Sequence, residues 1–126
     1  MTAKNILVLL AVLCFASCDQ SDGNDRTPVE YRLLAGANTV SSISFTGANG
    51  QPASVSASNL SDNWTQKIWV VKPFTAAVTV ELNNQTDEDQ EYVLQVYRKN
   101  GPIGTVIDTV PAMSVETGTV SASVAN

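Results

Sequence analysis

Residues 78–82 have the sequence Val78-Thr79-Val80-Glu81-Leu82. Its apolar residues occupy every second position, with one threonine and one glutamate between them. Successive side chains of an extended strand point to opposite faces, so this alternation gives one apolar face and one polar face. The stretch therefore predicts a β-strand that lies on a core with one side and faces solvent with the other.

The same period of two extends outward in both directions, from residue 29 to the end of the chain. Turn signals separate the alternating segments at intervals of roughly 8–12 residues. They include 46–52, Pro73, and 98–102, where an Asn-Gly pair is typical of a hairpin connection. No stretch of this region has helical spacing. We therefore predict an all-β fold over residues 29–126, a β-sandwich of about seven to nine antiparallel strands.

Two segments have patterns that predict their place in a sheet. Residues 53–58 alternate alanine or valine with serine, which indicates a thin edge strand. Residues 68–71, Ile-Trp-Val-Val, are apolar on both faces, which is typical of an interior strand or of one whose outer face is covered.

Composition excludes several classes of function. The chain has 126 residues, no histidine, 7 Lys+Arg against 12 Asp+Glu, and a formal net charge of -5. The absence of histidine removes most metal sites and the usual general base of serine and cysteine hydrolases. The net charge and the absence of a Lys or Arg run argue against nucleic acid or an anionic membrane surface as a partner. Since no phosphate loop, Gly-x-Ser-x-Gly or metal-ligand spacing occurs, we predict a protein that is not an enzyme and that uses no cofactor or metal.

The first 17 residues have the pattern of an export signal. Lys4 is the only charge before the ten-residue apolar run 6–15, which is too short for a comfortable transmembrane helix. The run ends in Phe15-Ala16-Ser17-Cys18, which resembles the lipobox of bacterial lipoproteins, although Phe15 stands where an aliphatic residue is usual. The resemblance implies a lipoprotein signal peptide over 1–17 and acyl chains on Cys18 that anchor the protein to a membrane. The alternative is an ordinary signal peptide, cleaved nearby, that leaves one free thiol.

Residues 18–28 are predicted to be the lipidated cysteine and a flexible acidic tether. An acidic stretch directly after the cysteine resembles the lipoprotein export signal of the Bacteroidetes group. This resemblance implies a cell-envelope protein of the outer membrane that is exposed on the cell surface.

The order of features in the domain resembles the mycobacterial small membrane proteins of the MmpS type. The resemblance covers roughly residues 29–120 and is carried by Val29-Glu30-Tyr31, Gly36-Ala37, Ser42-Ile43-Ser44-Phe45-Thr46, Gly50, Leu60 before Trp64, and Ala76-Ala77 before Val80. It implies an Ig-like sandwich outside the membrane and, for some members, a role as accessory subunit of an envelope transporter. The chain departs from the family in its predicted lipid anchor and in lacking the cysteine pair associated with the family's C-terminal half.

Two tryptophans are candidates for a binding surface. Trp64 follows a polar loop, where an exposed ring could stack on a sugar, and core packing is the alternative. For Trp69 we expect a place in the core, because a domain this small needs large apolar side chains there.

The acidic residues and one threonine complete the candidates. Residues 87–91 hold four acids, which we interpret as a solvated hairpin tip, with calcium binding as the alternative. A glycosidase needs two facing carboxylates, whereas Glu30, Glu81 and Glu116 stand on faces that the alternation marks as outward. Asp108-Thr109-Val110 matches the loose pattern of Bacteroidetes O-glycosylation, which makes Thr109 a possible acceptor.

The sequence thus predicts a non-catalytic envelope lipoprotein that acts as an interaction or structural module, with an envelope or extracellular protein or a glycan as partner. A transporter accessory subunit and a carbohydrate-binding domain are the alternatives.

Overall fold

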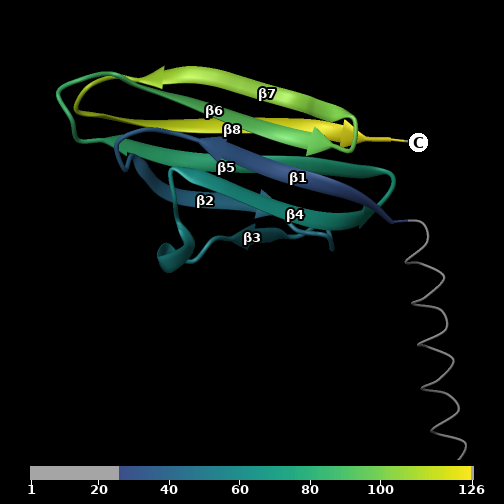
Figure 1. Ribbon diagram of the computed structural model, residues 1–126. Coiled ribbons are helices and arrows are strands. Elements are labelled where there is room, and N and C mark those ends of the chain that lie inside the picture. The colour runs from purple at the N-terminus through teal and green to yellow at the C-terminus, as the bar shows by residue number, and fades with distance from the viewer. Residues whose placement is uncertain (1–25, 126) are drawn as a thin grey trace, which may run out of the picture.

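The computed structural model describes residues 26–125 (Figure 1). The predicted signal peptide, Cys18 and the tether up to residue 25 lie outside the described residues.

The described chain forms two four-stranded antiparallel sheets that pack face to face, as the alternation predicted. Sheet A contains, in spatial order, β4 (Asn63–Val71), β1 (Arg26–Leu34), β6 (Gln90–Arg98) and β7 (Gly101–Val110). Sheet B contains β3 (Pro52–Ser54), β2 (Val40–Thr46), β5 (Phe74–Asn84) and β8 (Ser114–Val124). A single 3-10 turn, η1 (Ala57–Asn59), lies between β3 and β4. The all-β sandwich is therefore confirmed, with eight strands in the described residues.

The connections alternate between the sheets. Only β2–β3 and β6–β7 are hairpins within one sheet, and the second turns at the predicted Asn-Gly pair. Every other connection between described strands passes from one sheet to the other. In an immunoglobulin constant domain, the first, second, fourth and fifth strands share one sheet. Here the first, fourth, sixth and seventh strands do so, and this order decides which loops meet at each end.

The core lies between the two sheets and uses the alternate positions of seven strands. The largest fully buried side chains are Tyr31, Leu33, Ile43, Leu82, Leu94, Val29, Val70, Val78, Val80, Val96, Val110 and Val124. Val78, Val80 and Leu82, from the stretch that defined the fold, are among them. Burying a valine or leucine side chain stabilises the fold by roughly 1.5–3 kcal/mol, so this row anchors sheet B.

The strand ends define two ends of the sandwich. At the proximal end β1 begins, β4 and β6 end, and β8 reaches the C-terminus (Figure 1). At the distal end β1 ends and β4 and β6 begin. The β5–β6 and β7–β8 connections also lie at this end. Because neighbouring strands are antiparallel, residues far apart in sequence meet at each end.

Three details differ from the expectations. β1 begins at Arg26, so residues 26–28, which we assigned to the tether, belong to a strand. β4 is an edge strand with an exposed outer face instead of an interior or covered strand. The acidic loop around residues 87–89 connects β5 in sheet B with β6 in sheet A, so it is not a hairpin tip.

Candidate functional site

The proximal end and the adjoining outer face of sheet A carry a surface of positive charge. All six lysines and arginines of the described residues lie there, and we call them the basic surface: Arg26, Arg32, Lys67, Lys72, Arg98 and Lys99. They come from β1, β4, the β4–β5 connection, the end of β6 and the β6–β7 turn. Strand pairing brings together charges that are up to 73 residues apart in the sequence, the separation of Arg26 and Lys99.

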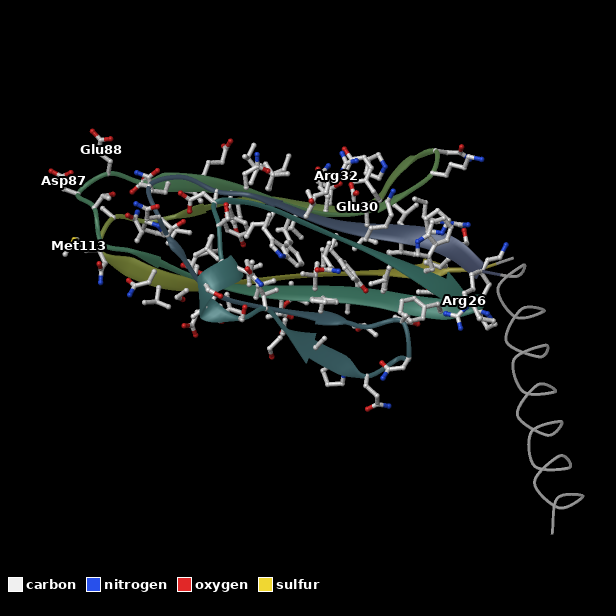
Figure 2. The ribbon with its side chains drawn as sticks, turned by 60° about the horizontal axis from the view of Figure 1, so that its bottom comes forward. Arg26, Glu30, Arg32, Asp87, Glu88 and Met113 are labelled. Carbon is white, nitrogen blue, oxygen red and sulfur yellow. The ribbon has the colours of Figure 1, made fainter. Side chains whose placement is uncertain are left out.

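The acidic side chains lie mostly toward the other end. Of the nine acids among the described residues, only Glu30 lies within the basic surface. The others are in the distal half: Asp62, Glu81, Asp87, Glu88, Asp89, Glu91, Asp108 and Glu116. Figure 2 shows the separation, with Arg26 at the proximal end and Asp87 and Glu88 at the distal end. The described domain is thus positive at one end and negative at the other.

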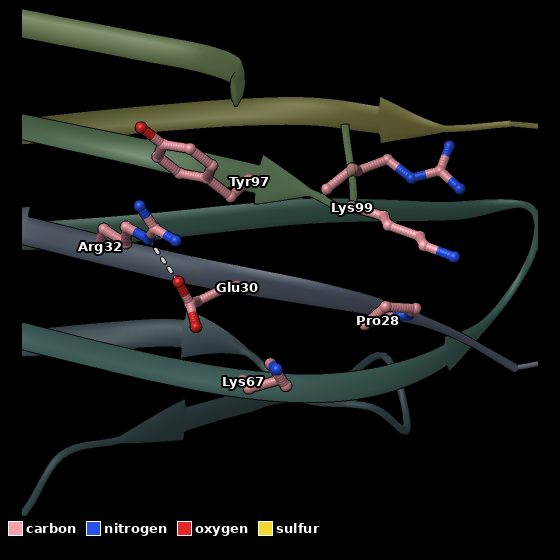
Figure 3. Close-up of a pocket in the computed structure, with 7 residues that line it drawn as sticks. Pro28, Glu30, Arg32, Lys67, Tyr97 and Lys99 are labelled. Atoms are coloured by element: carbon pink, nitrogen blue, oxygen red, sulfur yellow. Dashed lines mark hydrogen bonds and ion pairs between the residues drawn. The ribbon is translucent and has the colours of Figure 1, made fainter. Parts of the chain in front are cut away.

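A shallow hollow of about 220 Å³ lies within the basic surface (Figure 3). It is lined by Pro28, Glu30, Arg32, Lys67, Tyr97, Arg98 and Lys99. The Arg32 guanidinium lies 3.7 Å from the centre of the Tyr97 ring and pairs with the carboxylate of Glu30. The hydrogen bond that Arg32 donates to the Glu30 carboxylate raises the pKa of Arg32, so this guanidinium stays charged. These three groups form one wall of the hollow. The contact with the ring and the ion pair with Glu30 both restrict the position of the Arg32 side chain.

The other cations of the basic surface have no carboxylate partner among residues 26–125. Arg26 donates to the carbonyl of Trp69 at 3.3 Å, and Arg98 donates to the hydroxyl of Thr27 at 3.2 Å. In the described residues no acidic oxygen lies within 4.0 Å of Lys67 or Lys99. These amino groups are therefore available to phosphates or carboxylates from outside the domain.

Exposed apolar side chains adjoin the basic surface on β4. Trp69 is 53% exposed and Val71 is 47% exposed, and both are on the same outer face as Lys67. This corrects the expectation that Trp69 packs in the core. The two tryptophans are five positions apart, so in one strand they must point to opposite faces.

Trp64 takes the core position instead. It is 6% exposed and packs on Phe45, whose ring centre is 5.8 Å from its own, and Phe45 also contacts Tyr31. A ring buried in this way is not available for stacking on a sugar, so core packing is the alternative that applies to Trp64.

A second exposed apolar feature crosses the distal half of sheet A. Leu34, Val93 and Ile107 are directly opposite one another on β1, β6 and β7. Leu34 is 57% exposed, Ile107 is 63% exposed, and Val93 between them is partly buried. Side chains that are directly opposite on neighbouring strands are close enough to touch. We call Leu34, Val93 and Ile107 together the apolar stripe.

The remaining candidates are placed as follows. Thr109 is exposed near the distal end of β7, while Cys18 lies outside the described residues. Glu30 and Glu81 face outward, whereas Glu116 is opposite Leu82 in the ladder and so lies on the side of sheet B that faces sheet A. Its charge, together with burial and Asp108, contributes to raising the pKa of Tyr92, with burial the largest cause.

Within residues 26–125 no three His, Cys, Asp or Glu side chains are grouped to hold a metal ion. No helix of this part of the chain is long and apolar enough to cross a bilayer.

Sequence reasoning missed the basic surface because it looked for a run of positive charge along the chain. The six cations form no run, and only the order of strands in sheet A brings them together. The sequence did contain one signal for it: four of the six cations, Arg26, Lys72, Arg98 and Lys99, are close to a predicted turn or strand end.

No protein-family model matches the chain, and a search of curated proteins finds no significant match.

Proposed function

We propose that this protein is a non-catalytic lipoprotein of the bacterial cell envelope, anchored by acyl chains on Cys18, whose sandwich acts as an interaction module. The apolar run 6–15 and the lipobox-like residues that end in Cys18 support the anchor. The sandwich starts only eight positions after this cysteine, at Arg26, so anchor and domain are close neighbours.

The observation that carries the role as an interaction module is the apolar stripe. The domain already buries a full set of apolar side chains between its sheets, and Leu34 and Ile107 are not part of that core. Contiguous apolar side chains from three adjacent strands, with polar residues around them, are typical of a protein-binding surface. We expect the stripe to be the contact for an envelope or extracellular protein.

The anchor is tested by comparing the wild-type protein with Cys18→Ala in cell fractions. The wild type should be in the membrane fraction with acyl chains on residue 18 by mass spectrometry, and the variant should be soluble. Protease added to intact cells should remove the wild-type domain if it is on the cell surface. A wild-type protein without acyl chains would contradict the proposal.

The stripe is tested by photo-crosslinking in intact cells. Ile107→p-benzoylphenylalanine should give a discrete adduct, while the same change at Thr117, exposed on the outer face of sheet B, should give none. An adduct with a transporter subunit would favour the accessory role that the MmpS resemblance implies. Equal labelling at both positions would contradict a specific role for the stripe.

Carbohydrate binding is a second candidate, and it now depends on Trp69 instead of Trp64. The Trp69 ring is half exposed beside the hollow of the basic surface, so a sugar could stack on it. Glycan titration should then quench tryptophan fluorescence in the wild type and not in Trp69→Ala.

A further inference from the structure

We propose that the proximal end of the domain docks on an anionic lipid surface, through the basic surface and the exposed side chains of Trp69 and Val71. This inference rests on the proposed function, because the bilayer in question is the one that holds the Cys18 anchor.

The reach of the chain limits how far the domain can lie from its anchor. Eight Cα steps separate Cys18 from Arg26, and a fully extended chain covers at most about 3.6 Å per step, or about 29 Å in total. β8 alone has 11 residues, which at about 3.3 Å each make the sandwich about 36 Å long. The proximal end must therefore stay near the membrane, while the distal end need not come near it.

The charges of the domain complement those of an anionic lipid surface. Apart from the Arg32–Glu30 pair, the basic surface has five positive charges and no carboxylate among the described residues, and eight carboxylates lie in the distal half. An anionic lipid surface attracts each nearby lysine or arginine by about 1 kcal/mol, an effect that fades over a Debye length of about 8 Å at physiological salt. The same surface repels the distal acids, so both ends of the domain favour the same orientation.

The exposed residues between the cations have the chemistry that suits a lipid interface. Trp69 and Val71 are exposed on β4, with Arg26 opposite Val71 in the ladder and Lys67 on the same face. Tryptophan prefers the interface between lipid headgroups and acyl chains, and lysine or arginine beside it reaches the phosphates. Ile103, 40% exposed beside the β6–β7 turn, adds a second apolar contact at the same end.

The test uses the mature chain, residues 18–126, as Cys18→Ser, so that no acyl chain contributes to binding. The described core lies wholly within this chain. Sedimentation is measured with vesicles of phosphatidylcholine alone and of phosphatidylcholine mixed with phosphatidylglycerol, at low and at high salt. We expect binding to the mixed vesicles only, and loss of that binding at high salt.

A charge variant and a matched control locate the contact. The variant neutralises three lysines of the basic surface, Lys67→Gln/Lys72→Gln/Lys99→Gln. At about 1 kcal/mol per charge, or roughly fivefold each, vesicle binding should fall about 100-fold. The control changes the net charge equally at exposed distal positions, Ser56→Asp/Asn59→Asp/Gln85→Glu, and should keep most of the binding.

Three outcomes would overturn the proposal. They are failure of the parent protein to bind mixed vesicles, equal loss in variant and control, and binding that appears only after Asp19→Asn/Asp22→Asn/Asp25→Asn. The last would identify the chain's own acidic tether as the occupant of the basic surface. Because Cys18→Ser carries no lipid, none of these results depends on the anchor, which the fractionation experiment tests separately.

Discussion

At the distal end, Asn84 is a fully buried polar residue that connects two turns. Its side-chain nitrogen donates to the carbonyl oxygens of Glu88, Val110 and Pro111, at 2.7, 3.0 and 3.2 Å. Its oxygen accepts from the backbone and the hydroxyl of Thr86, at 3.0 and 2.7 Å. One amide thus holds the acidic β5–β6 loop against the end of β7.

Asn84→Ala should lower the free energy of unfolding by about 3 kcal/mol, because it leaves buried carbonyl groups without a partner. Urea unfolding followed by tryptophan fluorescence measures this. The neighbouring Asn83→Ala is the control, since the hydrogen bond of Asn83 to Thr39 uses its backbone and survives the change. Similar losses in both variants would contradict the role of the Asn84 side chain.

Tyr31 makes the stability depend on pH. It is fully buried, its hydroxyl donates to the carbonyl of Thr46 at 2.7 Å, and burial raises its pKa from 10.0 to about 12. Above pH 10 the unfolded chain loses this proton while the folded chain keeps it, so stability falls as the pH rises toward 12. The slope for one such group is about 1.4 kcal/mol per pH unit.

We therefore expect the free energy of unfolding to decrease steeply over this range, and to decrease less steeply in Tyr31→Phe. The slope should not vanish in the variant, because burial also raises the pKa of Tyr92. Urea unfolding across the alkaline range measures both slopes. An unchanged slope in Tyr31→Phe would show that Tyr31 is not protected from ionisation.

At the scale of elements, β6 and β8 approach closely through a glycine. A Cβ atom on Gly118 would lie 2.5 Å from the hydroxyl oxygen of Tyr92 and 2.7 and 2.9 Å from its ring carbons. Tyr92 is only 3% exposed, so the ring has little room to move. Gly118 thus lets the ring of β6 lie directly on the backbone of β8.

Gly118→Ala should cost about 1–3 kcal/mol of stability by overpacking this contact. Introduced into Tyr92→Leu, the same change should cost much less, because the ring that it meets is gone. Thermal or urea unfolding of the four proteins of this cycle gives the coupling. Additive effects would contradict the contact.

The strands themselves could be predicted because alternation records which side chains share a face. The segment 78–82 lies within β5, and the Asn-Gly pair formed the β6–β7 turn. The segment 53–58 was correctly placed at an edge, but only its first two residues belong to β3, and residues 57–59 form the turn η1. Alternation does not record which strand lies alongside which. The apolar segment 68–71 was therefore assigned to an interior or covered strand, although it belongs to edge strand β4.

For the molecule as a whole, the candidate site could not be predicted because the sequence pattern does not show which strands are neighbours. The basic surface exists because β1 lies between β4 and β6 and runs antiparallel to both. The start of β1 then meets the ends of its two neighbours, and with them Arg26, Lys72 and Arg98. Net charge is a sum that does not record where the charges lie, so a chain of net charge -5 can still have a positive end.

If this positive end lies on the membrane, the Trp69 ring must be close to the lipid acyl chains, and its fluorescence reports that position. The lipidated protein is reconstituted into anionic vesicles with and without bromine on the lipid acyl chains, which quenches nearby tryptophan. We predict quenching in the wild type and almost none in Trp69→Phe, since its remaining Trp64 is buried in the core. Equal emission from wild-type protein in brominated and ordinary vesicles would show that the proximal end does not lie on the membrane.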